Sequence, residues 1–164
     1  MNTPPIIDLR SAVADDANAI WAVRVRAIDR ECRAHYPADV IDAWLASPMP
    51  ASFSALIEAE KFIVAVSRTR IVGFAGLKPS VSELEALFVD PEFTGLGVGT
   101  RLLTQLELLA RELGLSRLTL KASLNSVTFY RSAGYVERGR GEHTSFSCLR
   151  LACVHMDKAL RGSI

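Results

Sequence analysis

The hydrophobic residues of the chain follow two periods, one typical of strands and the other typical of helices. Runs rich in β-branched and aromatic residues predict strands, and apolar positions three or four residues apart predict helices. The predicted strands are residues 6–10, 61–67, 71–77, 83–89, 117–122, 135–138 and 149–156. Five helices are predicted. The first follows Asp16 and runs to about residue 28, the second spans residues 38–46, and a short third helix ends near residue 60. The fourth lies between Gly99 and Gly114, and the fifth spans residues 125–133.

The order of these elements predicts the fold class. Strands interleaved with helices are typical of an α/β (α+β) domain with a mixed central sheet, here of about six or seven strands. The most regular helix has one apolar face and ends at Gly114; this face comprises Leu102, Leu103, Leu106, Leu109, Ala110 and Leu113. A length of 164 residues predicts a single domain spanning residues 1–164.

Charge and cysteine content exclude several classes of protein. The chain has 19 Lys and Arg against 18 Asp and Glu, a net charge of +1, so bulk electrostatics give no reason to expect nucleic-acid binding. Cys32, Cys148 and Cys153 lack CxxC spacing, which argues against a disulfide framework and a zinc site. There is no signal-peptide pattern and no apolar run near the ~20 residues that span a bilayer. We therefore expect a cytoplasmic protein with no membrane partner.

The most informative segment is the glycine-rich loop from Thr94 to Gly99, which joins the strand 83–89 to the most regular helix. Glycines let the backbone approach a ligand closely, and the N–H groups of a first helical turn favour an anion. The loop therefore predicts a phosphate or pyrophosphate site, and the alternative is a tight turn without a ligand. A Walker loop is excluded because Gly99 is followed by Thr100-Arg101. A Rossmann fingerprint is excluded because the spacing is GxGxG and no acid follows ~20 residues later.

Two motifs carry a resemblance to a known family. Val89-Asp90-Pro91, the glycine loop and its helix resemble the central motif of the GCN5-related N-acetyltransferase (GNAT) family. The segment 125–135, an Asn followed by Phe-Tyr and then Gly-Tyr, is similar to the next motif of that family, and the segment 154–160 resembles its last strand. The resemblance covers roughly residues 83–160. It departs at Thr94, where the family usually has Gln or Arg; the backbone N–H there can still serve an anion.

This resemblance implies the GNAT fold, in which helices flank a mixed sheet that splays between its two central strands. It implies an N-acetyltransferase that moves the acetyl group of acetyl-CoA to a primary amine of a small molecule or peptide, by direct attack in a ternary complex and without a metal. The implied residues at the acetyl-CoA site are Leu87, Phe88, Val89, Thr94, Gly95, Leu96, Gly97, Val98, Gly99, Thr100, Asn125, Phe129 and Arg131.

The resemblance also assigns roles within this set. The backbone N–H groups from Gly95 to Thr100 would hold the pyrophosphate, and the exposed edge of Leu87 to Val89 would pair with the pantetheine amides. Asn125 would bind the cofactor arm, and it is also a candidate N-cap of the helix after it. Arg131 would reach a cofactor phosphate, with an exposed helix arginine as the alternative.

Three residues are candidates for catalysis. Tyr130 is the candidate general acid that protonates the departing thiolate; core packing is the alternative role. Glu83 and Glu85 are candidate bases for the acceptor ammonium, since strand alternation predicts that they share one face with Leu87 and Val89. Glu85 is our first choice, and a solvated edge is the alternative.

The rest of the chain leaves the acceptor open. We expect Arg24, Arg26, Arg30 and Arg33 to form a solvated helix face, and His143 to lie in a polar loop. His35 and the aromatic residues Trp21, Tyr36 and Trp44 are candidates for an acceptor pocket, and core packing explains the aromatic residues equally well. A homodimer is possible. The alternative function is a non-catalytic sensor or regulatory module that binds CoA, which would need neither Tyr130 nor an acid on the strand.

Overall fold

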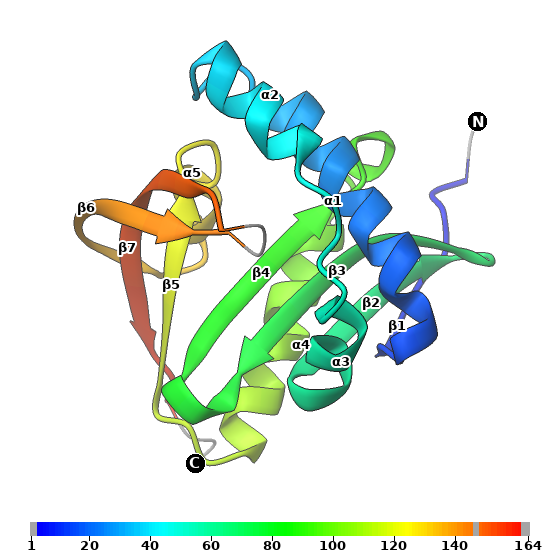
Figure 1. Ribbon diagram of the computed structural model, residues 1–164. Coiled ribbons are helices and arrows are strands. Elements are labelled where there is room, and N and C mark those ends of the chain that lie inside the picture. The colour runs from blue at the N-terminus through cyan, green and yellow to red at the C-terminus, as the bar shows by residue number, and fades with distance from the viewer. Residues whose placement is uncertain (1–2, 146–147, 162–164) are drawn as a thin grey trace.

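A single mixed sheet of seven strands organises the computed structural model, which describes residues 3–145 and 148–161 (Figure 1). The strand order is β1-β2-β3-β4-β5-β7-β6, and every neighbouring pair is antiparallel except β4 and β5. The strands are β1 (Ile7–Ser11), β2 (Lys61–Ser67), β3 (Arg70–Lys78), β4 (Glu83–Val89), β5 (Arg117–Ser123), β6 (Val136–Thr144) and β7 (Arg150–Ala159). The predicted mixed sheet of about six or seven strands is confirmed.

Helices cover both faces of this sheet. They are α1 (Ala17–Glu31), α2 (Ala38–Ala46), α3 (Phe53–Ala59), α4 (Val98–Glu112) and α5 (Val127–Ser132). The apolar stripe of α4 packs on one face, whereas α1 and α3 pack on the other face over β2 and β3 (Figure 1). A third apolar cluster joins α1 and α2 to β7 through Tyr36 and Leu151. Among the described residues, no helix is both long and apolar enough to cross a membrane.

The two central strands of the sheet, β4 and β5, separate soon after they begin. They pair only through Glu83 with Thr119 and Leu84 with Leu120, and Figure 1 shows them diverging beyond that point. Because β4 stays paired with β3 along the rest of its length, its opposite edge has no strand partner among the described residues after Leu84. The predicted splay is therefore present.

A β-bulge at Glu85 overturns the predicted alternation along β4. Gly76 pairs with Ala86 and the next residue, Leu77, pairs with Leu84, so Glu85 is the extra residue. Past the bulge the faces exchange. Leu84, Leu87 and Val89 pack on the α4 side, whereas Ala86 and Phe88 pack toward α1 and α3. The prediction that Glu83, Glu85, Leu87 and Val89 share one face is wrong, because strict alternation holds only in a strand without a bulge.

The last two strands are longer than their apolar patterns predict. Strand β6 extends to Thr144 instead of ending near Arg138, and β7 ends at Ala159 instead of Met156. Nearly all of β6 is exposed, so its side chains carry no apolar alternation, and backbone pairing with β7 defines it instead. The polar loop predicted around His143 is therefore a strand.

The stability of α4 on the sheet can be tested with a matched pair of leucines. Leu106 is fully buried, whereas Leu108 on the same helix is 46% exposed. We expect Leu106→Ala to lower the free energy of unfolding by about 2–5 kcal/mol, because it leaves a cavity in the core. Leu108→Ala should change it by about 0.5 kcal/mol or less. Urea denaturation measures both, and equal losses would contradict the packing described here.

Candidate active site

A cavity of about 360 Å³ lies between the glycine loop, β4 and α5. Most of the predicted cofactor-binding residues line it, namely Leu87, Phe88, Val89, Thr94, Gly95, Gly97, Val98, Gly99, Thr100, Asn125 and Phe129. Two predicted residues are absent from this lining. Leu96 is 50% exposed, and Arg131 is exposed at the end of α5, where it forms an ion pair with Glu137. The structure thus gathers eleven of the thirteen predicted residues around one cavity.

The glycine loop presents backbone N–H groups to this cavity. Gly95 and Gly97 have left-handed backbone angles, φ 76° and φ 80°, which glycine adopts without strain. Nothing lies within 4 Å of a Cβ built on either residue, so the loop is open on that side. Gly97 caps α4 without a side-chain hydrogen bond, so no cap side chain satisfies the first-turn N–H groups. These features suit an anion at the helix N-terminus.

The unpaired edge of β4 borders the same cavity. Leu87, Phe88 and Val89 line it, and on the β5 side their backbone has no strand partner among the described residues. An extended molecule with amide groups can hydrogen-bond to such an edge as an added strand. The edge and the anion site together fit a ligand with a phosphate at one end and amides along its length, which is the chemistry of a CoA arm.

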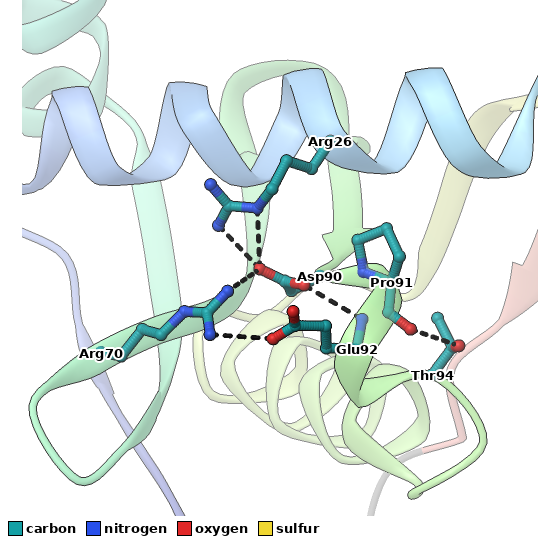
Figure 2. Close-up of polar contacts among 6 residues, drawn as sticks. All are labelled: Arg26, Arg70, Asp90, Pro91, Glu92 and Thr94. Carbon is teal, nitrogen blue, oxygen red and sulfur yellow. Dashed lines mark hydrogen bonds and ion pairs between the residues drawn. The ribbon is translucent and has the colours of Figure 1, made fainter.

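A buried carboxylate fixes the base of the loop. Asp90, 1% exposed, accepts hydrogen bonds from Arg26 (Nη2, 2.7 Å), Arg70 (Nη2, 2.8 Å) and the backbone N–H of Glu92 (3.0 Å), as Figure 2 shows. Burial alone would raise the pKa of Asp90, but the Glu92 N–H and the two guanidiniums hold it below its ordinary value. Asp90 therefore ties α1 and β3 to the turn that leads into the loop.

Thr94, at the first loop position, is also held within this turn. Its hydroxyl donates to the carbonyl of Pro91 at 3.0 Å (Figure 2). The hydrogen bond of the Thr94 hydroxyl is therefore made within the turn, while the residue still borders the cavity. This arrangement is consistent with a loop whose ligand contacts are main-chain N–H groups.

Asn125 is not an N-cap, contrary to one of its two predicted roles. Helix α5 begins at Val127 and its N-cap is Ser126. The Asn125 side chain lines the large cavity and its Oδ1 accepts from the thiol of Cys32, with Sγ at 3.3 Å. Burial raises the pKa of Cys32 to about 12, so this thiol stays protonated and can donate.

A second cavity, of about 210 Å³, lies on the far side of the splay and meets the first. Both are lined by Leu87, Phe88, Ser123 and Ser126, two residues from each side of the gap. The three predicted catalytic residues, Glu83, Glu85 and Tyr130, all line this second cavity. The splay therefore joins the cavity beside the glycine loop to a smaller cavity lined by titratable groups.

The two glutamates differ in their surroundings. Burial, followed by the negative charge of Glu60, raises the pKa of Glu85 to about 7, although Lys78 opposes the shift. Glu85 Oε2 is buried and has no hydrogen-bond partner among the described residues. Glu83 instead has Lys121 Nζ at 4.0 Å. The bulge places the Glu85 carboxylate at the step where the register of β4 against β3 shifts.

Tyr130 is buried against aromatic neighbours. Its ring contacts those of Phe129 and Tyr135 edge-on, with centroids 5.1 Å and 5.6 Å away. Burial raises the pKa of its hydroxyl, which is therefore a neutral phenol over the physiological range. Tyr130 thus packs in the core and also contributes to the lining of the smaller cavity.

Comparisons with known proteins identify this arrangement. Residues 32–160 match the acetyltransferase (GNAT) domain. This chain belongs to the GNAT acetyltransferase family. The crystal structure of a GCN5-related N-acetyltransferase from Rhodopseudomonas palustris is 31% identical and covers 96% of this chain and 97% of its own, with a TM-score of 0.86. Among curated proteins, the uncharacterized N-acetyltransferase YafP of Escherichia coli is 29% identical over 129 residues, which is 79% of this chain and 81% of that protein.

Two further proteins similar to this chain have names or structures that mention a substrate or a ligand. The IAA acetyltransferase of Azospirillum brasilense is 29% identical over 113 residues, or 60% of this chain and 74% of that protein. The PaiA N-acetyltransferase of Thermoplasma acidophilum, solved in complex with coenzyme A, is 20% identical with a TM-score of 0.71, covering 94% of this chain and 99% of its own. That second likeness shows a shared GNAT fold.

The prediction that four arginines form a solvated face of α1 is wrong for Arg24. Arg24 is 2% exposed and lines the smaller cavity. Arg26 is exposed, but it is bound to Asp90. A signal was present in the sequence, because Arg24 lies four residues after Ile20 and four before Ile28 on the apolar side of α1. An arginine at such a position is buried at a cost, which suggests a function.

Only some of the other residues considered for an acceptor pocket line the smaller cavity. Trp44 and His143 line the smaller cavity, whereas Trp21 and Tyr36 do not. Tyr36 has a structural role, because its hydroxyl donates to the carbonyl of Ala152 and accepts from the N–H of Leu124. His35 is exposed and lines neither cavity.

The contribution of the buried Asp90 carboxylate to stability can be tested by substitution. Asp90→Asn should lower the free energy of unfolding at neutral pH by about 1–3 kcal/mol, because it removes a charged acceptor from two guanidiniums. The folded-state pKa of Asp90 lies below its unfolded value of about 4, so its contribution is complete above that pH and is lost as the pH falls through the folded pKa.

Urea denaturation of both proteins at several pH values between about 7 and 3 measures this difference. The matched control is Asp29→Asn, since Asp29 pairs with Arg33 on the exposed side of α1; its effect should stay below about 0.5 kcal/mol. A loss for Asp90→Asn no larger than that of the control would contradict the role assigned to the network.

Proposed function

We propose that this GNAT acetyltransferase moves the acetyl group of acetyl-CoA to a primary amine, with acetyl-CoA in the larger cavity and the acceptor in the smaller one. The observation that carries the proposal is the junction of the two cavities at the β4–β5 splay, with Glu85 and Tyr130 lining the acceptor side. A module that only binds CoA needs no second cavity with titratable groups.

The chain would hold acetyl-CoA mainly through its backbone. The N–H groups from Gly95 to Thr100 suit the pyrophosphate, and the free edge of Leu87–Val89 suits the pantetheine amides. Asn125 and Phe129, which line the same cavity, would contact the arm. When bound, acetyl-CoA supplies an activated acetyl thioester as the acyl donor.

Glu85 would take the proton that an ammonium must lose before its nitrogen can attack. A carboxylate with a pKa of about 7 is half ionised near neutrality, so it can both accept this proton and release it to solvent. Glu83 is the second candidate base, and one of its carboxylate oxygens lies 4.0 Å from Lys121 Nζ.

Tyr130 would donate its phenol proton to the sulfur that leaves with CoA. Its raised pKa keeps that proton in place until a thiolate, a stronger base than water, develops beside it. The rigid aromatic packing around the ring restricts its position.

The function itself is tested by thiol release from acetyl-CoA across a panel of primary amines, with mass spectrometry of the acceptors. Acetyl-CoA binding is measured separately by calorimetry, with NAD and ATP for comparison. We expect acceptor-dependent thiol release and preferential binding of acetyl-CoA. Tight binding of acetyl-CoA without release across a broad panel would favour a sensor, and no binding would overturn the cofactor assignment as well.

The proton-accepting role of Glu85 predicts a pH profile. We expect kcat/KM to rise with pH through an apparent pKa of about 7, because only the carboxylate form accepts a proton. Glu85→Gln should lower kcat roughly 10²-fold or more and remove this inflection. Glu112→Gln, at the exposed end of α4, is the control and should retain the wild-type profile. An unchanged inflection in Glu85→Gln would move the role to Glu83 or to another group.

The same substitution should affect stability in the opposite direction. The folded-state pKa of Glu85 is raised above its unfolded value, so the folded state loses stability as the pH rises from about 4.5 to 7. Glu85→Gln removes this loss, and we expect it to be more resistant to urea than the wild type at pH 8 but not at pH 4. A pH-independent difference would contradict the raised pKa.

The proton-donating role of Tyr130 is tested by Tyr130→Phe, which removes only the hydroxyl. We expect kcat to fall by about 10²-fold while the Kd of acetyl-CoA changes less than about twofold. The control is Tyr135→Phe, because the Tyr135 hydroxyl donates to Glu107 and neither residue lines the two cavities; it should lower stability and leave the kcat of the folded protein nearly unchanged. Unchanged kcat in Tyr130→Phe would assign Tyr130 to the core alone.

A further inference from the structure

The smaller cavity contains a buried cation that the proposed proton transfers do not use. Arg24 projects from α1 with 2% of its surface exposed. Its guanidinium stacks on the ring of Trp21, 4.2 Å from the centroid, and lies 6.0 Å from that of Trp44. Burial lowers the pKa of Arg24 to about 10, so the group stays charged at neutral pH. A guanidinium is planar and carries its N–H donors in that plane, which suits it to bind a carboxylate.

Further polar groups line the same cavity. Lys121 and His143 line it with Arg24. Burial, and then the positive charges of Lys121 and Arg24, lower the pKa of His143, so the three groups lie within electrostatic range of one another. Trp44 is 4% exposed, and its Nε1–H is buried with no acceptor among the described residues. A buried donor without an acceptor is costly unless a ligand satisfies it.

The same cavity is also lined by the two carboxylates of β4, Glu83 and Glu85. Glu85 lies within range of Glu60, Lys78 and Glu83, and neither Arg24 nor His143 is among the groups that act on it. The cavity lining therefore carries charges of both signs: the Glu85 carboxylate comes from β4, the Arg24 guanidinium from α1, and Lys121, whose Nζ lies 4.0 Å from Glu83, from β5. A volume of about 210 Å³ restricts the occupant to a compact molecule.

We propose that the acceptor is a small amino acid, whose carboxylate binds Arg24 and the Trp44 N–H while its amine faces Glu85. The proposal rests on the proposed function and adds the substrate class. A planar guanidinium pairs with a carboxylate through two parallel hydrogen bonds, which is why arginine suits this anion. The acid and the cations then hold the two charged ends of one zwitterion, and the amine is directed toward the splay.

The test compares L-α-amino acids with their carboxamides, which keep the amine and the side chain but lack the negative charge. We expect at least one free amino acid to have a kcat/KM roughly 10²-fold above that of its carboxamide. Arg24→Met should reduce this preference to about twofold or less, because it removes the charge and keeps most of the volume. Arg30→Met, on the exposed side of α1, should leave the preference unchanged.

A preference ratio measured within one variant is insensitive to partial loss of folded protein. If Arg24→Met does not fold, Trp44→Phe gives the second test, since it keeps the aromatic packing and removes the Nε1–H; we expect the preference to fall several-fold. Calorimetry of amino acid and carboxamide, each with CoA present, measures the recognition without turnover.

The outcomes separate the two proposals. Acetylation of amines without a preference for the carboxylate, or a preference that survives Arg24→Met, would overturn the amino-acid inference and leave the transferase intact. Arg24-dependent binding of amino acids without acetylation would overturn the proposed reaction and support the binding site. If no amino acid is bound or acetylated, the amino-acid inference is overturned. Acetylation of other amines would then show that the proposed reaction itself stands.

Discussion

The divergence of β4 from β5 is the constraint on which the rest of the site depends. Two parallel strands that stayed paired would satisfy each other's backbone and close the middle of the sheet. Here they pair at only two positions, so the β4 backbone keeps an edge that can bind a ligand. The divergence also opens the space in which the two cavities meet. Every proposed contact of donor and acceptor is made at or beside this gap.

Opening a sheet at its centre is unfavourable unless its two halves are held by other contacts. On one side, Asp90 joins α1, β3 and the start of the glycine loop through two guanidiniums and one N–H. On the other, Tyr36 connects the β5–α5 turn to β7 through its hydroxyl. These are buried or partly buried polar contacts, which specify a geometry more than apolar packing does. They keep both walls of the gap in place while its interior stays accessible.

Some residues of the candidate site could be predicted from the sequence, and others could not. The glycine loop could be located because glycine, proline and the helix that follows are local signals, and the anion site uses backbone groups adjacent in sequence. Tyr130 and Asn125 were found only through a family motif. Arg24 was missed as a buried group, although its place among apolar residues on α1 was visible, because burial of an arginine depends on which elements cover that helix face. The alternation along β4 failed at Glu85, since a bulge is a property of pairing with β3 and leaves no mark in the pattern of β4 itself.

The sequence by itself determined the elements, the mixed sheet and the position of the anion loop, because these follow from short-range periodicity, turn residues and helix ends. The tertiary structure decided which of the charged residues meet. Glu85, Tyr130, Arg24 and His143 come from β4, α5, α1 and β6, and only the packing of those elements brings them around one cavity. It also decided their charge states, because desolvation depends on surroundings contributed by distant parts of the chain. That is why the fold and the glycine loop could be predicted from the sequence, whereas the proposed acceptor had to be inferred from the structure.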